Sequence, residues 1–234
     1  MRLCETSVKD HTDPRPKSPP EAVPLVPWPV QRTLRCPPTT PPPLTSFTGV
    51  FEARRSSREM THAPLREIVN VLAFATQPRF VLASDALKRT RRPSPSAGAL
   101  HPIDIALVDW RGAPRLMRYD SLLHQLDILV PLTFLDDLRE LAHTSEEILP
   151  GARGTAIVLL GDLARVAATY DNPDTLLWRD AGALLQTLFL AATAFRLAFC
   201  PLGILGHEVV RALGLEQRLT AAGVALIGRP SSAD

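Results

Sequence analysis

Apolar residues recur at helical spacing in four segments of the chain. The first begins beside Pro64, which fits the first turn of a helix, with Thr61 as the candidate cap. Its apolar positions are Leu65, Ile68, Val69, Leu72, Phe74 and Ala75. Residues 134–143 and 207–213 predict two further helices. Residues 180–197 predict a long helix with so few polar positions that it belongs in the core.

Strand patterns lie between these helices. Residues 103–107 alternate between the apolar Ile103, Ile105 and Leu107 and their neighbours, and after a turn at 109–114 the chain returns over 115–119 as the second strand of a hairpin. Residues 155–160 form a continuous apolar run, which is typical of a central strand buried on both faces. A last short strand is expected at 224–227. The pattern therefore predicts an α+β fold, a small central sheet wrapped by helices.

The first 47 residues differ from the rest and hold about half of the 23 prolines. Pro37–Pro38 and Pro41–Pro43 cannot lie in a helix interior or a central strand, so we expect an arm that is disordered or extended as polyproline. Its middle, residues 23–30, is apolar and contains Trp28, which favours packing on the body or on a partner subunit instead. We therefore divide the chain into an arm, 1–47, and a folded domain, 48–234.

Composition narrows the class of protein without identifying it. A chain of 234 residues, 45% hydrophobic, can bury one substantial core, and its net charge of +2 gives no reason to expect nucleic-acid binding. Cys4, Cys36 and Cys200 are scattered, which argues against a disulfide framework or a zinc site and fits a reducing cytoplasm. The polar start of the chain does not resemble a signal peptide, and no apolar run reaches the roughly 20 residues of a membrane span.

Three short motifs carry the candidate chemistry. Residues 54–58 read Arg-Arg-Ser-Ser-Arg, and guanidinium groups beside hydroxyls suit a phosphate. Residues 95–102 read Pro-Ser-Ala-Gly-Ala-Leu-His-Pro, a turn of small residues that lets the backbone approach a ligand closely. Residues 179–186 read Arg-Asp-Ala-Gly-Ala-Leu-Leu-Gln, and Gly228-Arg229-Pro230 lies near the end. Taken singly, these are also what a basic surface, a turn and a core helix would show.

In this order and spacing, the motifs resemble the nitroreductase superfamily over roughly residues 50 to 230. The similarity is greatest to the branch that contains SagB-type dehydrogenases and azoline oxidases, whose members carry a segment much like residues 95–102. This resemblance implies a mostly antiparallel sheet and a long buried central helix that forms much of a homodimer core. It also implies FMN as the cofactor, bound at the subunit interface.

The resemblance also implies roles for individual residues. Arg54 and Ser56 would contact the phosphate and ribityl chain of FMN with Arg55 beside them, Arg58 would lie near the pyrimidine edge, and Arg229 would bind the phosphate. The remaining cofactor residues would be Pro95, Ser96, Ala97 and Gly98 on the isoalloxazine, Gln186 in the long helix, and Pro201, Leu202 and Gly203 near flavin N5.

Two polar residues near the turn have simpler interpretations. His101 is common at this place in the family, but a hydrogen bond within the turn is the more ordinary role for it than proton transfer. Asp104 matches a carboxylate that often follows His-Pro, and it could orient an arginine or face solvent.

Two departures from the family pattern bear on activity. The family usually has Gly-Leu-Gly after the long helix, whereas this chain has Phe195-Arg196-Leu197-Ala198-Phe199, which could narrow the substrate side. Azoline oxidases carry a Lys-Tyr pair where this chain has Thr169-Tyr170. Tyr170 is therefore the candidate catalytic residue, as an acid–base or orienting group, although a phenol without a neighbouring ammonium is a poor base near neutral pH. An ordinary tyrosine at a helix end is the alternative.

These inferences predict an FMN-dependent oxidoreductase that moves a hydride through flavin N5, as a cytoplasmic homodimer. NAD(P)H is the expected electron donor, and the substrate would be a small molecule or a peptide-derived heterocycle. The alternative is a non-catalytic or flavin-free scaffold subunit of the same fold that supports a peptide-modifying partner. A third, weaker alternative is nucleic-acid binding through the basic segment 89–92.

Overall fold

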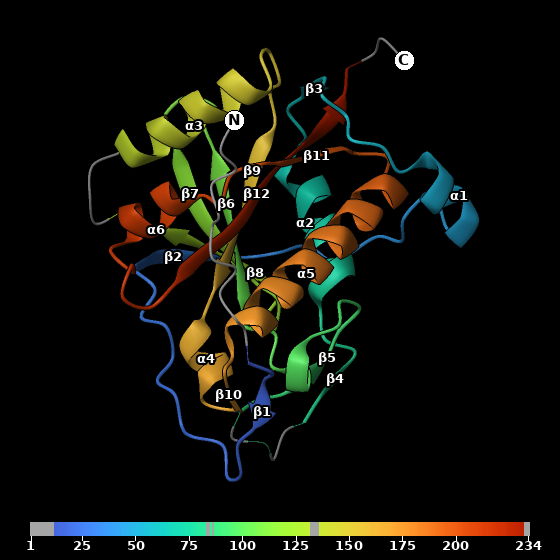
Figure 1. Cartoon of the computed structure of the whole chain (residues 1–234). Helices are drawn as coiled ribbons and strands as arrows, with labels where there is room; N and C mark the ends of the chain where they lie inside the picture. Colours follow the sequence, from blue (N-terminus) through green and yellow to red (C-terminus); the bar gives the residue numbers. More distant parts are fainter. Residues whose placement is uncertain (1–11, 83–84, 86, 132–135, 232–234) are drawn as a thin grey trace, which may run out of the picture.

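The computed structural model describes residues 12–82, 85, 87–131 and 136–231. A twisted sheet stands between two layers of helices, with α3 (Asp136–Ile148) and α6 (His207–Leu213) on one face. On the other face lie α2 (Leu65–Thr76) and α5 (Asp174–Ala194), and Figure 1 shows α5 crossing this face diagonally. The short α1 (Phe47–Ala53) contacts α5, and the short α4 (Leu163–Ala167) lies before α5 in the chain.

The sheet has eight strands among the described residues, and all of its pairs are antiparallel. The order is β11-β12-β9-β6-β7-β8-β2, with β3 paired to β12. The bounds are β2 (Val30–Arg35), β3 (Met60–Thr61), β6 (Ile103–Asp109), β7 (Arg115–Asp120), β8 (Gln125–Leu129), β9 (Thr155–Gly161), β11 (Ala198–Leu202) and β12 (Thr220–Pro230). Two-residue pairs β1 (Arg15–Pro16) with β10 (Tyr170–Asp171) and β4 (Phe80–Val81) with β5 (Thr90–Arg91) lie outside it.

Alternation along the central strands divides the core in two. In β9, Ile157 and Leu159 pack toward α2 and α5, whereas Ala156, Val158 and Leu160 pack toward α3 and α6. Successive side chains of a strand point to opposite faces, and all seven residues of β9 are buried because helices cover both faces. The apolar run at 155–160 is thereby confirmed as a central strand, and the α+β class is confirmed with it.

The long helix α5 is also confirmed, although it begins earlier than the sequence pattern indicated and ends at Ala194. It stops because Arg196 takes the left-handed conformation, with φ of 56°, that a glycine more often supplies after a helix. Helix α6 has the predicted bounds, and Gly214 ends it with φ of 64°. None of the described helices is long and apolar enough to cross a lipid bilayer.

Three local predictions need correction. Thr61 does not cap α2, because Met60 and Thr61 pair with the end of β12 and Pro64 is the residue at the start of the helix. The segment 54–58, which we expected to start or precede a short helix, instead follows the short helix α1, whose C-cap is Arg54. Strands β2 and β8 were not predicted, and their mutual pairing makes the sheet larger than expected.

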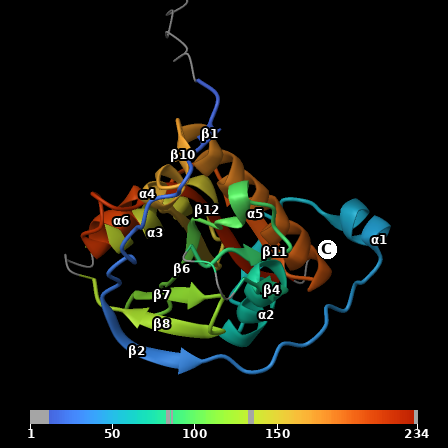
Figure 2. The ribbon, with the colours of Figure 1, turned by 90° about the horizontal axis from the view of Figure 1, so that it is seen from below.

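The described part of the arm lies along the body. Strand β2 pairs with β8 at the edge of the sheet, as Figure 2 shows, and β1 pairs with β10 beside α4. Between them, residues 20–28 cross the surface, where the Trp28 ring lies 5.0 Å from the guanidinium carbon of Arg118. Packing of Trp28 on the body is the outcome that its apolar surroundings favoured.

Gly228→Ala tests the close approach of β3 to β12. A Cβ at position 228 would fall on the carbonyl oxygen of Thr61, which is backbone and cannot move aside alone. We expect the substitution to lower the free energy of unfolding by about 1–3 kcal/mol in urea titrations. Gly203→Ala is the matched control, since no atom lies within 4 Å of its added Cβ. Equal stability of the two variants would contradict this account.

Candidate functional site

The basic motif 54–58 lies beside the C-terminal half of α5. The Arg54 guanidinium carbon is 4.9 Å from the centroid of the Phe189 ring, and the Ser57 N–H donates to the carbonyl of Phe199 in β11 (3.1 Å). Arg55, Ser56 and Arg58 are exposed along this segment. Arg58 is close enough to Cys200 of β11 to act on its thiol. Burial raises the pKa of Cys200, and the positive charge of Arg58 opposes that rise.

Arg229 belongs to β12, which pairs with β11 along the edge opposite to Ser57. In the β11–β12 pairing Ile227 is opposite Phe199, so Ser57 and Ile227 flank one residue of β11. Two strand spacings of about 4.8 Å then separate the segments that carry Arg54 and Arg229. Arg229 is engaged in this structure, because its Nε donates to Glu67 Oε2 (3.0 Å) and its Nη2 to Glu67 Oε1. We call Arg54, Arg55, Ser56, Arg58 and Arg229 the basic half-site.

The turn of small residues is held by a carboxylate of α5. Ser96 Oγ donates to Asp180 Oδ2 (2.5 Å), and the Ala97 N–H donates to Asp180 Oδ1 (3.1 Å). Ser96 Oγ also accepts from the His101 N–H (2.9 Å). Burial raises the pKa of Asp180, and the bonds from Ser96 and Ala97 oppose that rise. A carboxylate on the buried face of the helix therefore fixes the conformation of the turn.

Tyr170 packs against this turn. Gly98 has φ of 57°, and a Cβ there would lie 2.9 Å from the Tyr170 hydroxyl oxygen, so the ring needs glycine at this position. Tyr170 belongs to β10, which holds it by pairing with Pro16 of the arm. We call Pro95, Ser96, Ala97, Gly98 and Tyr170 the loop half-site.

The two half-sites lie at different levels of α5. The loop half-site is bonded to Asp180, while the basic half-site contacts Phe189, nine residues further on. At 1.5 Å per residue the two levels are about 13 Å apart along the helix axis. Between them, Gly182 and Gln186 lie on the exposed face of α5, and no atom comes within 4 Å of a Cβ added at Gly182.

In the segment after α5, the open backbone is that of Gly203. Pro201 is half-buried at the end of β11, Leu202 is buried, and Gly203 is exposed with no atom within 4 Å of an added Cβ. The bulky residues that replace the family's glycines turn inward: Phe199 stacks on Phe189 at 5.1 Å, and Phe195 meets Phe74 edge-on at 5.8 Å. The rings of Phe195 and Phe199 therefore pack between α2, α5 and β11.

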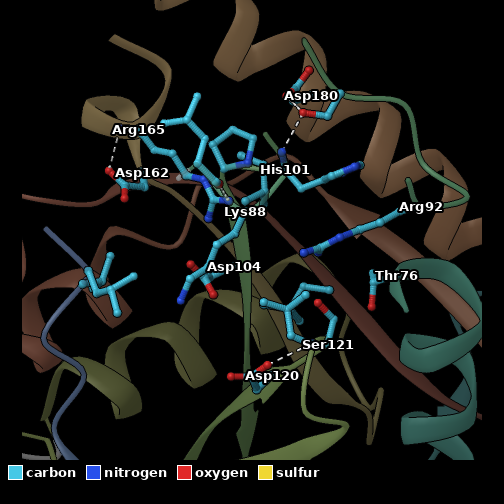
Figure 3. A pocket seen from close by; sticks show the side chains of 18 of the residues that line it. Thr76, Lys88, Arg92, His101, Asp104, Asp120, Ser121, Asp162, Arg165 and Asp180 are labelled. Atoms are coloured by element: carbon cyan, nitrogen blue, oxygen red, sulfur yellow. Dashed lines mark hydrogen bonds between the residues drawn. The ribbon is translucent and has the colours of Figure 1, made fainter. Parts of the chain in front are cut away.

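A cavity of about 650 Å³ lies on the inner side of the loop half-site. Its walls come from the ends of β6 and β7, from α4 and from the first half of α5, and residues 20–28 of the arm form one side. Figure 3 shows the polar side chains that line it, with His101 between Arg165 and Arg92 in this view. Of the candidate cofactor residues, Pro95 and Ser96 line this cavity, and none of the basic half-site does.

His101 and Asp104 take the simpler of their expected roles. His101 Nε2–H donates to the Thr90 carbonyl (2.9 Å), so the ring braces the turn. Burial, and next the nearby charge of Arg92, lowers the pKa of His101 to about 4. Asp104 accepts from Arg118 Nε (3.0 Å) and orients that arginine.

Sequence reasoning missed the role of Asp180 and the cavity. The signal for Asp180 was present, since a carboxylate among Leu177, Ala181 and Leu184 lies on the apolar face of a core helix. No comparable signal marked Arg92, because residues 89–92 read only as a basic loop. In the structure this segment is not an open basic patch: Arg89 pairs with Asp85, and Arg92 lines the cavity.

The sequence pattern of the nitroreductase family matches residues 52–229. The chain belongs to the nitroreductase family. The match spans both half-sites, from the residues just before Arg54 to Arg229. No curated protein sequence matches the chain.

Solved structures agree in fold. A protein of Ralstonia eutropha JMP134, provisionally assigned as a nitroreductase, has 18% identity and a TM-score of 0.64 over 94% of this chain and 100% of its own. One from Exiguobacterium sibiricum 255-15, assigned in the same way and solved with FMN, has 15% identity and a TM-score of 0.56 over 83% and 93% of the chains. A chain of the E. coli microcin synthetase McbBCD, solved with truncated pro-MccB17, has 18% identity and a TM-score of 0.54 over 76% and 70%. At these identities the likeness concerns the nitroreductase fold.

The protonation of His101 predicts a dependence of stability on pH. Its pKa falls from 6.5 when unfolded to about 4 when folded, so below pH 6.5 the unfolded chain binds the proton first. Stability is full above pH 6.5 and is lost as the pH falls toward 4. The whole shift would correspond to about 3 kcal/mol, and because the ring is partly exposed to solvent we expect about 1–2 kcal/mol.

His101→Gln removes this titration. Urea unfolding of both proteins above pH 6.5 and near pH 4 should show the larger loss in the wild type, and the difference between the two isolates His101 from the acidic residues. Equal losses in both proteins would show that His101 does not titrate in this way.

Proposed function

We propose that this member of the nitroreductase family is an FMN-dependent oxidoreductase that acts as a homodimer. The observation that carries the proposal is the basic half-site: arginines from both ends of the folded domain flank one end of β11, and Gly203, whose backbone is open, follows the other end of that strand. Guanidinium groups bind phosphate by charge-assisted, bidentate hydrogen bonds, and the backbone of Gly203 is open to a flat ring because no atom lies within 4 Å of a Cβ added there.

The residues present fit FMN. Arg54 and Ser56 would bind the phosphate and ribityl chain, with Arg55 beside them, and Arg58 would lie near the pyrimidine edge of the flavin. Arg229 would also bind the phosphate. It would either donate to the phosphate and Glu67 at the same time or break its ion pair with Glu67. When bound, FMN supplies hydride transfer at N5, and the part of this chain is to bind, orient and shield it. Pro201, Leu202 and Gly203 would present backbone to the ring, and Tyr170 would orient the substrate or hold its proton.

The separation of the half-sites supports a dimer in which each flavin is held by two chains. Half-sites about 13 Å apart on one helix cannot both enclose the same end of a ligand, but a two-fold axis midway between their levels on α5, between Gly182 and Gln186, would bring the basic half-site of one chain to the loop half-site of the other. Apolar side chains are exposed near both ends of α5: Trp178 is 44% exposed in the first half of the helix, and Phe47 (75%) and Phe51 (55%) lie on α1, which contacts α5. Gln186 would then lie at the interface.

NAD(P)H is the proposed electron donor, and the substrate is proposed to be a small molecule or a peptide-derived heterocycle. Binding would place the substrate against the face of the ring that the loop half-site leaves open. The catalytic contribution of the chain would then be orientation of the substrate and exclusion of water, with the Tyr170 phenol packed against Gly98 of the turn.

Mixed dimers test the shared site. Arg54→Gln disables the basic half-site and Pro95→Trp the loop half-site, and each homodimer should bind FMN at least about tenfold more weakly than wild type. A mixed dimer, purified through two different tags, contains one intact pair and should bind one FMN per dimer with near wild-type affinity. The exposed Arg139→Gln is the control and should bind FMN normally. A mixed dimer that fails to bind FMN would refute sharing between chains.

Anaerobic reduction tests for an enzyme. We expect protein purified with FMN to be yellow and to lose its visible absorbance on addition of NADH or NADPH, because hydride transfer reduces the flavin. The same should hold for Tyr170→Phe, since the proposed role of Tyr170 concerns the substrate. Bound flavin that neither nucleotide bleaches would instead favour the scaffold subunit.

A further inference from the structure

The cavity behind the loop half-site contains cations that lack acidic partners. Arg92 lines it from the segment after β5, and its Nε donates to the neutral hydroxyl of Thr90 (2.9 Å). Arg165 lines it from α4, and its Nη2 donates to the carbonyl of Leu87 (3.2 Å). Within the described ranges, no carboxylate forms an ion pair with either guanidinium. Lys88 also lines the cavity, and it is exposed.

The acidic residues of the cavity are engaged elsewhere. Asp104 and Asp120 both bind Arg118, at 3.0 and 3.3 Å. Asp162 binds Arg218 at 2.7 Å and caps α4, while Asp180 holds the turn of the loop half-site. At the rim, Asp85 pairs with Arg89 and Glu21 with Lys17. Among the described residues, Arg92 and Arg165 therefore have no ion-pair partner, although the nearby charges of Asp104 and Asp120 act to raise the pKa of Arg92.

This arrangement is unfavourable for the empty protein. Burial, followed by the charge of Arg165, lowers the pKa of Arg92 to about 10, which shows how strongly the site disfavours an isolated cation. His101, between the two arginines in Figure 3, stays neutral at physiological pH and adds no negative charge. Two like charges facing one partly buried space repel each other, and an anion between them would convert that repulsion into attraction.

We propose that this cavity binds a small organic anion, with its acidic oxygens between Arg92 and Arg165. The body of the ligand would pack on Ile103, Ile105 and Leu184, which line the same space, and residues 22–26 of the arm provide further apolar surface. A carboxylate and a phosphate ester share the chemistry that two guanidinium groups recognise. The site is separate from the basic half-site, none of whose residues lines the cavity, so it does not depend on the flavin assignment.

The test measures binding of simple probes to the full chain in its flavin-loaded form. Benzoate and phenyl phosphate present the two acidic groups on an apolar body, benzamide is the neutral counterpart of benzoate, and inorganic phosphate lacks the body. Calorimetric titration should show binding of benzoate, phenyl phosphate or both, with benzamide and inorganic phosphate at least about tenfold weaker.

Neighbouring arginines provide matched variants. Arg92→Gln and Arg165→Gln should each weaken binding of the anionic probe at least about tenfold, whereas Arg91→Gln, an exposed arginine of β5 outside the cavity, should leave it unchanged. Without any anion, Arg92→Gln should melt no lower than wild type, because it removes an uncompensated charge. A merely structural Arg92 would give a lower melting temperature. If Arg92→Gln does not fold, the loss of anion binding in Arg165→Gln tests the proposal instead.

Several results would overturn the proposal. They are failure of both benzoate and phenyl phosphate to bind, equally tight binding of benzamide or of inorganic phosphate, and an equal loss of anion binding in Arg91→Gln and Arg92→Gln. Loss of FMN from Arg92→Gln, with FMN retained in Arg54→Gln, would show that the cavity holds the flavin phosphate and would reject both this site and the basic half-site. Anion binding that persists in a flavin-free preparation supports the cavity even if the proposed oxidoreductase function fails.

Discussion

The carboxylate of Asp180 is the interaction on which the organisation of this molecule depends. It lies on the apolar face of α5 and accepts from the Ser96 hydroxyl and the Ala97 N–H, which ties the turn of small residues to the core. That turn contains three residues with positive φ, Gly98, Ala99 and His101, a conformation that is unfavourable for the last two. A buried acid with specific donors compensates for this strain and holds the turn in one conformation.

Two spaces meet at this turn. Its outer side, with Gly98 and Tyr170, forms the loop half-site that we assign to the flavin and its substrate. Its inner side, with Ser96 and His101, closes the cavity that faces Arg92 and Arg165. Because one hydrogen-bonded network supports both sides, occupancy of the inner cavity would be felt at the outer surface through Ser96 and Asp180. The proposed flavin site and the proposed anion-binding cavity therefore meet at a few polar side chains of this turn.

The arm contributes to both spaces as well. Its first strand pairs with β10 and thereby holds Tyr170, and its middle covers the cavity, where Arg218 donates to the Pro24 carbonyl (2.7 Å). Its second strand extends the sheet beyond β8. A proline-rich segment can do this because an edge strand needs hydrogen bonds on one side alone, and the prolines at 37–38 and 41–43 fall after β2 rather than within it.

The sequence by itself determined the central elements, since β9, α5, α6 and the β6–β7 hairpin follow from apolar periodicity, which reflects burial on one or both faces. It also determined the family, because Arg54–Arg58, Pro95–Gly98 and Arg229 stand in the family's order. Tertiary structure alone decided how these pieces combine. The pairing of β2 with β8, the bonds of Asp180 to the turn and the ion pair of Arg229 with Glu67 all join residues distant along the chain. Tertiary structure also decided that, among the described residues, neither Arg92 nor Arg165 has a carboxylate as an ion-pair partner. Periodicity reports which face of an element is buried, whereas the charge balance of a cavity depends on which distant side chains the packed elements bring together.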